Sequence, residues 1–346
     1  MNVLIEQAKA TAREWVEREA ANFPGFQGAF LHGSVTWLPD DAWMPPASDL
    51  DIVVVLADES VVAKPGKFRR DGVLLEVSFL PQDEVASAEQ ILGSSHLAGS
   101  FRQHGILADP GGRLTAIQRD VARAYARRMW VERRCQHAIE KIGRGMRVAH
   151  DASFPDKVNS WLFPAGITTH VLLLAGLRNP TVRTRYVAVR ELLEDYGQDG
   201  IYPLLLDLLG AREISPALAR RHLDALALAF DMASGVIRTP FFFAADITPG
   251  ARVIPTDGSA AMIARGDHRE AMFWIAATFT RCQQVLQSDA PGLFAEHEAA
   301  YLSLLHELGA ATDGEMQRRK EQIREAEPAI LRTATAIMDA NPEIAS

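Results

Sequence analysis

Cysteine is scarce in this chain, which has only Cys135 and Cys282 among its 346 residues. The two lie far apart and form no Cys-x-x-Cys or Cys/His spacing, so the sequence predicts neither a disulfide framework nor a zinc site. Low-complexity tracts and short-period repeats are also missing. With 48% hydrophobic and 23% charged residues, the composition is that of an ordinary globular protein. We therefore expect a protein of the reducing cytoplasm.

Long apolar runs and a surplus of positive charge are missing as well. The N-terminal segment has apolar residues at helical spacing, but charged residues interrupt them, which argues against a signal peptide. The longest uncharged apolar stretch, 161–177, contains proline, glycine and histidine, so it predicts a buried helix and no membrane span. The formal net charge of −8 disfavours extended binding to nucleic acid, which needs many cationic phosphate contacts. Small molecules therefore remain as possible substrates.

Strand signals are confined to the first third of the chain. Short β-rich runs bounded by turn residues predict strands over 28–32, 50–56 and 72–80. After Leu114, long segments rich in Ala, Leu, Arg and Glu follow at helical period. The length suits two domains. We therefore predict a small domain with strands and helices over residues 1–112, and a helical domain over 113–346 with a subdivision near 239–258.

The chemistry-bearing residues gather between Gly28 and Leu56. A short apolar strand runs into Gly33-Ser34, where the missing side chain lets the backbone approach a ligand and Ser34 can open a helix whose free N–H groups attract phosphate. After an interval of 14 residues, Asp49 and Asp51 stand one residue apart on a strand, so their carboxylates point to the same face. This order predicts a triphosphate cradle beside a platform for divalent metal ions.

A third acid lies on the next predicted strand. Alternate residues from Val73 to Phe79 form its apolar face and leave Glu76 on the other face. A carboxylate in mid-strand is costly unless it has a partner, and a metal shared with Asp49 or Asp51 would supply one. Each residue alone belongs to ordinary turn and strand chemistry. The ordered set of strand, Gly-Ser, Asp-x-Asp and later strand acid is much more specific.

These residues resemble the DNA polymerase β-like nucleotidyltransferase superfamily. HGSVTW at 32–37, SDLDIVVVL at 48–56 and LLEVSFLPQDEV at 74–85 look most like its kanamycin-type aminoglycoside nucleotidyltransferase branch, and the likeness covers about the first 200 residues. The resemblance implies an α+β fold, in which a catalytic domain with a mixed sheet precedes an all-helical bundle. It also implies Mg²⁺-dependent transfer of a nucleoside monophosphate from ATP, or another nucleoside triphosphate, to a hydroxyl of a small molecule with release of pyrophosphate. An aminoglycoside-type antibiotic is the leading acceptor, hence a role in antibiotic resistance.

The resemblance assigns roles to individual residues of the first domain. Gly33 and Ser34 would hold the β- and γ-phosphates of the nucleotide. Asp49 and Asp51 would hold Mg²⁺, two ions in all, with Glu76 as the third ligand. Members of this branch often form homodimers, so a second copy of the chain is an expected partner, whereas a membrane or extended nucleic acid is not.

A catalytic base is expected on a helix of the second domain. In the resembled branch a helical Glu acts as general base, and a cation one turn later contacts phosphate. Glu140 and Arg144 have this spacing, with Lys141 as a further phosphate contact. They lie in a basic stretch, 113–147, with ten Lys/Arg against three acids. A solvated or salt-bridged helix face explains the same pattern. The alternatives are Glu132 for the base and Lys141 or Lys157 for the cation.

Two other functions fit part of the pattern. In toxin–antitoxin-type nucleotidyltransferases, which modify protein or RNA, a helical domain carries an Arg followed a few residues later by a His. Arg144 and His150 satisfy that spacing, but the acidic net charge disfavours work on nucleic acid. A non-catalytic nucleotide-binding protein would keep the fold without turnover. The intact Gly-Ser and Asp-x-Asp pairs argue against it, since a degenerate site is expected to lose a metal ligand.

Overall fold

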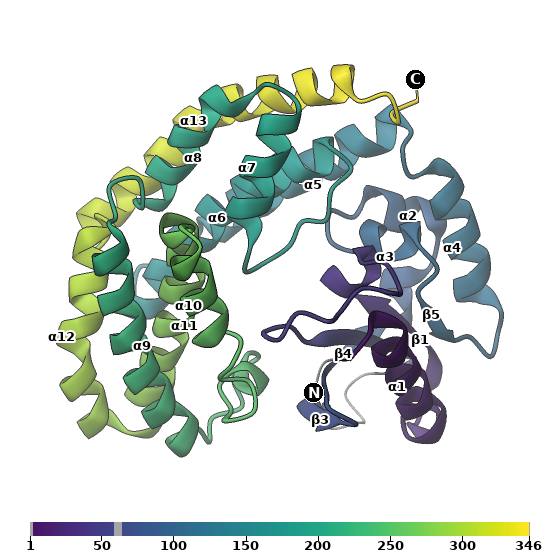
Figure 1. The fold of residues 1–346 in the computed structure, drawn as a ribbon, viewed down its shortest axis with the longest axis horizontal. Helices are drawn as coiled ribbons and strands as arrows, with labels where there is room; N and C mark the ends of the chain where they lie inside the picture. The colour runs from purple at the N-terminus through teal and green to yellow at the C-terminus, as the bar shows by residue number, and fades with distance from the viewer. Residues whose placement is uncertain (1–2, 59–63, 346) are drawn as a thin grey trace. The chain divides into compact units, whose positions relative to one another are not determined.

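The computed structural model describes residues 3–58 and 64–345 (Figure 1). A five-stranded mixed sheet lies near the N-terminus, and helices make up most of the remainder, which confirms the predicted α+β class. The chain divides into two compact units, Met1–His137 with Glu343–Ser346, and Ala138–Pro342. The sheet belongs wholly to the first unit.

The sheet contains three strands that the sequence predicts and two that it does not. The strands are β1 (Phe26–His32), β2 (Leu50–Leu56), β3 (Gly66–Arg70), β4 (Val73–Pro81) and β5 (Ile106–Ala108). Their spatial order is β3-β4-β2-β1-β5, with β2 and β4 parallel and the other neighbours antiparallel. The sequence gives no apolar strand pattern for β3, which is rich in charge, or for β5, which has only 3 residues.

One face of the sheet forms a core with helix α1 (Ile5–Arg18). Alternate residues of β2 and β4, such as Ile52 and Val77, are fully buried there together with Trp15 of α1. Burying an aliphatic side chain of this size contributes about 1.5–3 kcal/mol. Because strand side chains alternate between faces, this burial turns Asp51 and Glu76 to the opposite face. The apolar pattern of the sequence predicts this orientation.

Strand register aligns four polar residues in one row across the sheet. Lys67 of β3 pairs with Glu76 of β4, Glu76 pairs with Asp51 of β2, and Asp51 pairs with His32 of β1. Directly paired residues of neighbouring strands carry their side chains on the same face. The row ends beside Gly33, the residue that follows β1. The topology therefore gathers side chains from four strands at one place.

The first unit extends past the break predicted at Pro110–Gly112. Arg134 of helix α5 (Arg128–Gly145) is fully buried, and it donates to the carbonyl oxygens of Leu92 at 3.2 Å and Tyr125 at 2.8 Å. Such a buried guanidinium ties the start of α5 to the sheet unit, so the division falls within α5. The other helices here are α2 (Ala88–Gly93), α3 (Ala98–Arg102), α4 (Arg113–Ala124) and the first part of α5 (Arg128–Gly145), with 3₁₀ turns η1 (Ala20–Asn22), η2 (Ser34–Trp37) and η4 (Gln82–Val85).

The second unit is helical. Its elements after α5 are α6 (Phe154–Ala175), α7 (Arg185–Asp195), η5 (Asp199–Ile201), α8 (Tyr202–Leu209), α9 (Pro216–Val236), η6 (Ala244–Asp246), α10 (Asp257–Ala264), α11 (His268–Asp289), α12 (Pro291–Glu307) and α13 (Asp313–Ala340). Helix α6 packs against α13, and α9 against α11. Within 3–58 and 64–345, α6 alone is long and apolar enough to cross a bilayer, yet 78% of that stretch is buried inside the protein. It is the core helix that the sequence predicts there.

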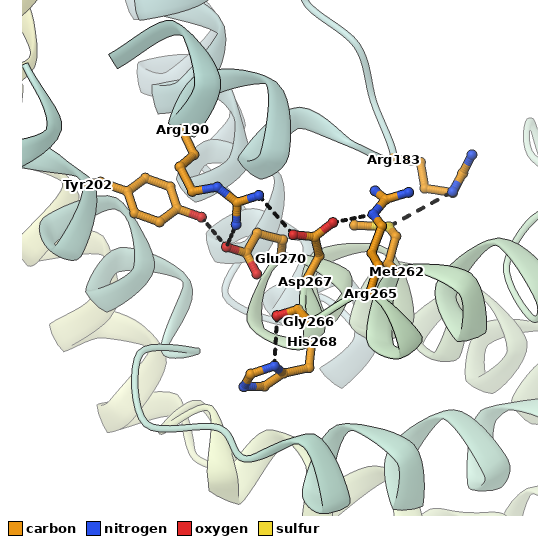
Figure 2. A network of polar contacts seen from close by, with 9 residues as sticks. All are labelled: Arg183, Arg190, Tyr202, Met262, Arg265, Gly266, Asp267, His268 and Glu270. Carbon is orange, nitrogen blue, oxygen red and sulfur yellow. Dashed lines mark hydrogen bonds and ion pairs between the residues drawn. The ribbon is translucent and has the colours of Figure 1, made fainter. Parts of the chain in front are cut away.

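A buried polar network joins three helices of the second unit (Figure 2). Glu270 of α11 is fully buried and accepts hydrogen bonds from Arg190 of α7 at 2.7 Å and from the hydroxyl of Tyr202 of α8 at 2.5 Å. Arg190 also donates to Asp267 at 2.8 Å. Burial, with the Glu270 charge, raises the pKa of Tyr202, so its hydroxyl stays a donor. Paired in this way, a carboxylate can remain inside the bundle.

Candidate metal centre

Three carboxylates converge on the polar face of the sheet. Asp49 directly precedes β2, Asp51 lies in β2, and Glu76 lies opposite Asp51 in β4. One oxygen atom from each lies within 4.8 Å of the other two. Carboxylate oxygens at this spacing are the donors that hard divalent cations prefer. The structure thus brings together the three acids singled out in the sequence, and they could hold a metal ion.

Gly33 closes one side of this cluster. Its backbone has φ 71° and ψ −159°, a region that only glycine adopts without strain. A Cβ atom at this position would overlap the carboxylate of Asp51 and would lie 2.9 Å from its Cγ. The absence of a side chain is therefore what allows the Asp51 carboxylate to sit directly against the turn.

The turn after Gly33 is shorter than the sequence suggests. Ser34 opens η2, a single 3₁₀ turn of 4 residues, where a longer helix with several free N–H groups is expected. The Thr36 hydroxyl donates to the carbonyl oxygen of Gly33 at 2.8 Å and fixes the turn. A helix macrodipole grows with aligned peptide units, so one turn contributes little of it. Any phosphate affinity here must come from local N–H groups and from a metal ion.

Lys67 is a member of the cluster that the sequence analysis missed. Its ammonium group donates to Oδ2 of Asp49 and to Oε2 of Glu76. Its side chain is only 5% exposed, which is rare for a lysine on an edge strand. The carboxylate oxygens therefore converge closely enough to hold one positive charge already.

The electrostatic environment of the cluster is reflected in the pKa of Asp51. Burial raises the pKa of Asp51 well above its usual range, the charges of Asp49 and Glu76 raise it further, and Lys67 partly offsets them. Burial and neighbouring negative charge disfavour the ionised form of such a carboxylate, and a bound cation favours it. The metal-free centre is thus short of positive charge even with Lys67 in place.

His32, which ends the polar row, has a structural contact. Its Nδ1 lies 2.6 Å from the hydroxyl oxygen of Ser100, a buried residue of α3. This contact ties the last residue of β1 to α3. It holds in place the strand end from which Gly33 departs.

The residues expected to supply a base and phosphate contacts lie on α5 in the second unit. Nη1 of Arg144 is 3.9 Å from Oε2 of Glu140, and both side chains are about half exposed. An exposed pair at this separation stabilises a helix little. Lys141 lies beside them on the same helix. The catalytic role of Glu140, Lys141 and Arg144 stays a prediction.

Both alternatives to these residues also form ion pairs. Glu132 accepts from Nε of Arg128 at 2.9 Å on the first turns of α5, within the first unit. Lys157 donates to Asp313 at 2.8 Å within the second unit. These partners give both residues an ordinary structural role in the protein.

Comparison with known proteins adds no relative from which function can be transferred. No protein-family model matches the chain, and no curated protein matches it. The geometry of the carboxylate cluster and the Gly-Ser turn is therefore the basis on which function can be proposed.

Proposed function

We propose that this protein is a metal-dependent nucleotidyltransferase. Mg²⁺ would bind at Asp49, Asp51 and Glu76, and the triphosphate would bind over Gly33-Ser34. The nucleoside monophosphate would pass from ATP, or another nucleoside triphosphate, to a hydroxyl of a small molecule, with release of pyrophosphate. The observation that carries this proposal is the meeting of three carboxylates with a side-chain-free turn at one end of β1 and β2.

The residues present fit a bound divalent ion. The donors are all carboxylate oxygens, which suit Mg²⁺. Lys67 already binds two of the acids as a cation would, and burial together with the charges of Asp49 and Glu76 raises the pKa of Asp51. The bare Cα of Gly33 lets the Asp51 carboxylate lie directly against the turn, so the acids and the turn meet at one place.

The reaction would use these groups mainly for positioning and charge neutralisation. A bound metal ion supplies charge stabilisation to the phosphates, worth several kcal/mol. Gly33 and Ser34 would offer their backbone N–H groups to the phosphates, with no side chain at Gly33. The new bond joins the acceptor oxygen to the α-phosphorus, the bond to pyrophosphate breaks, and the hydroxyl proton passes to a base. By resemblance that base is Glu140, with Arg144 and Lys141 as phosphate contacts.

The acceptor class follows from composition and resemblance. An aminoglycoside-type antibiotic is polyhydroxylated and cationic, and this chain carries a net charge of −8. Long-range attraction between opposite charges raises encounter rates. We therefore place hydroxylated cationic antibiotics first in any acceptor panel, followed by neutral sugars and small alcohols.

The test is pyrophosphate release from ATP and Mg²⁺ over this panel. Wild-type protein should release pyrophosphate with at least one acceptor. Asp49→Asn should reduce the rate by about 100-fold or more, because several kcal/mol of charge stabilisation are lost. Asp41→Asn, the same change at an exposed position of the first unit, should leave the rate unchanged. Equal rates in wild type and Asp49→Asn would refute the metal assignment.

A binding measurement separates catalysis from nucleotide storage. ATP should bind more tightly with Mg²⁺ than with excess chelator, and Asp49→Asn should lose this difference. Tight, metal-dependent ATP binding without pyrophosphate release across the panel would favour the non-catalytic alternative.

A further inference from the structure

Lys67 has an unusual place for a lysine. It lies on β3, the edge strand of the sheet, where lysine normally points into water and protects the edge from pairing. Here the Lys67 side chain is 5% exposed, less than the 21% of either acid that it contacts. The antiparallel pairing of Lys67 with Glu76 holds it over the polar face. Desolvating an ammonium group is costly, so its carboxylate partners must be what keeps it there.

The ammonium group also occupies ligand atoms. It is hydrogen-bonded to Oδ2 of Asp49 and to Oε2 of Glu76, and both acids belong to the set that could hold a metal ion. Each of these hydrogen bonds takes up a carboxylate oxygen that could otherwise bind a divalent ion. The smaller number of ligand atoms favours one ion over two that share the acids.

The formal charge of the cluster also favours a single divalent ion. Three ionised carboxylates and one ammonium leave a formal charge of −2 in the cluster, which one divalent ion neutralises. A second divalent ion would leave an excess of +2 in a largely buried site. Uncompensated buried charge is strongly unfavourable. The residues therefore hold one divalent ion more readily than the two that the resemblance implies.

We infer that Lys67 is a built-in second cation of this centre, so that the nucleotide-free protein binds a single divalent ion. This inference rests on the proposed metal site. An ammonium fixed to β3 supplies positive charge at the Asp49–Glu76 side whatever the metal concentration, and it keeps these two acids together before a metal arrives. Lys67 acts here as a positioning residue for the two acids, while Asp51 is the acid left for the ion.

The test counts ions on nucleotide-free, full-length protein by Mn²⁺ titration, with free Mn²⁺ read by electron paramagnetic resonance. Wild type should bind one Mn²⁺. Lys67→Met should bind two, with the first held about tenfold or more tightly because a nearby positive charge has gone. Lys67→Arg keeps the charge and should bind one. Lys9→Met removes a lysine that pairs with Asp40 at 2.7 Å elsewhere in the first unit, and should behave as wild type.

The other possible outcomes would overturn either the role of Lys67 or the metal site itself. Two ions on wild type would overturn the role of Lys67 and leave the metal site standing. One ion on Lys67→Met with unchanged affinity would also overturn it. No ion on wild type would remove the metal site and show a purely structural ion cluster. If Lys67→Met fails to fold, as judged by its thermal unfolding, Lys67→Gln takes its place with the same expectation of two ions.

Discussion

Replacing Gly33 by alanine should damage metal binding more than folding. The new Cβ would overlap the Asp51 carboxylate, since that position lies 2.9 Å even from Asp51 Cγ. Asp51 sits on the central strand β2 and cannot shift its backbone without moving the core behind it. Its carboxylate must therefore swing away from the turn, and the cluster loses the alignment of one of its three ligands.

The size of the effect has two parts. The backbone at Gly33, with φ 71° and ψ −159°, costs a non-glycine residue about 1–3 kcal/mol. At about 2–4 °C for each kcal/mol in a large domain, the melting temperature should fall by several degrees. Displacing a group that orients a metal ligand typically costs about 10–100-fold in metal affinity. We expect a loss of Mn²⁺ affinity in that range.

Gly112 offers a matched control. Its φ is 68°, so alanine there is also strained, but nothing lies within 4 Å of the Cβ position. Gly112→Ala should lower the melting temperature by an amount set by the backbone cost of about 1–2 kcal/mol, and should bind Mn²⁺ like wild type. Thermal unfolding and Mn²⁺ titration of both variants give the comparison. Wild-type affinity in folded Gly33→Ala would refute the close packing of the turn on the metal ligands.

Two further predictions concern pH and the helical unit. The raised pKa of Asp51 means that the folded, metal-free protein holds this proton more tightly than the unfolded chain, so its contribution to stability is lost as pH rises from the ordinary aspartate pKa to the folded one. The melting temperature of wild type minus that of Asp51→Asn should fall as pH rises over that window, and saturating Mn²⁺ should abolish the fall. If this difference stays flat or rises without metal, the prediction is wrong. Arg190→Met leaves Glu270 buried without its cation and should lower the free energy of unfolding, measured in urea, by about 3 kcal/mol. The double variant Arg190→Met with Glu270→Met should recover part of this loss. A loss below about 1 kcal/mol in the single variant would count against the prediction.

The strands that could be predicted are those with a strong apolar pattern. Residues 50–56 form an apolar run that only Asp51 interrupts, and residues 73–79 alternate, so both strands and the outward direction of Asp51 and Glu76 were predictable. The parallel pairing that sets these two residues opposite each other was not, because register between separate strands depends on tertiary packing. The predicted meeting of the acids therefore depended on the resemblance as well as on the strand pattern.

Lys67 was missed although a local signal exists. Asp71-Gly72 separates β3 from β4, and an Asp-Gly pair between two strands is a strong hairpin signal. Counting back from that two-residue turn sets Lys67 opposite Glu76, as observed. The charged run KFRR hid the strand, because charge of this kind normally indicates a solvated segment.

The division between the two compact units within α5 could not be predicted for a different reason. Pro110-Gly111-Gly112 looks like a linker, but it is a tight turn that leads into α4. What joins α4 and the start of α5 to the sheet unit is buried packing, including the Arg134 guanidinium. An arginine in a basic helix gives no sign in the sequence that it will be fully buried.

The central claim is that Asp49, Asp51 and Glu76 form a metal centre for a nucleoside triphosphate. Anomalous diffraction at the manganese edge, from crystals grown with Mn²⁺ and a non-hydrolysable ATP analogue, tests it most directly. We predict an anomalous peak bound by Asp49 and Asp51, with the triphosphate against Gly33-Ser34. Nucleotide bound elsewhere, with no peak at these carboxylates, would contradict the account.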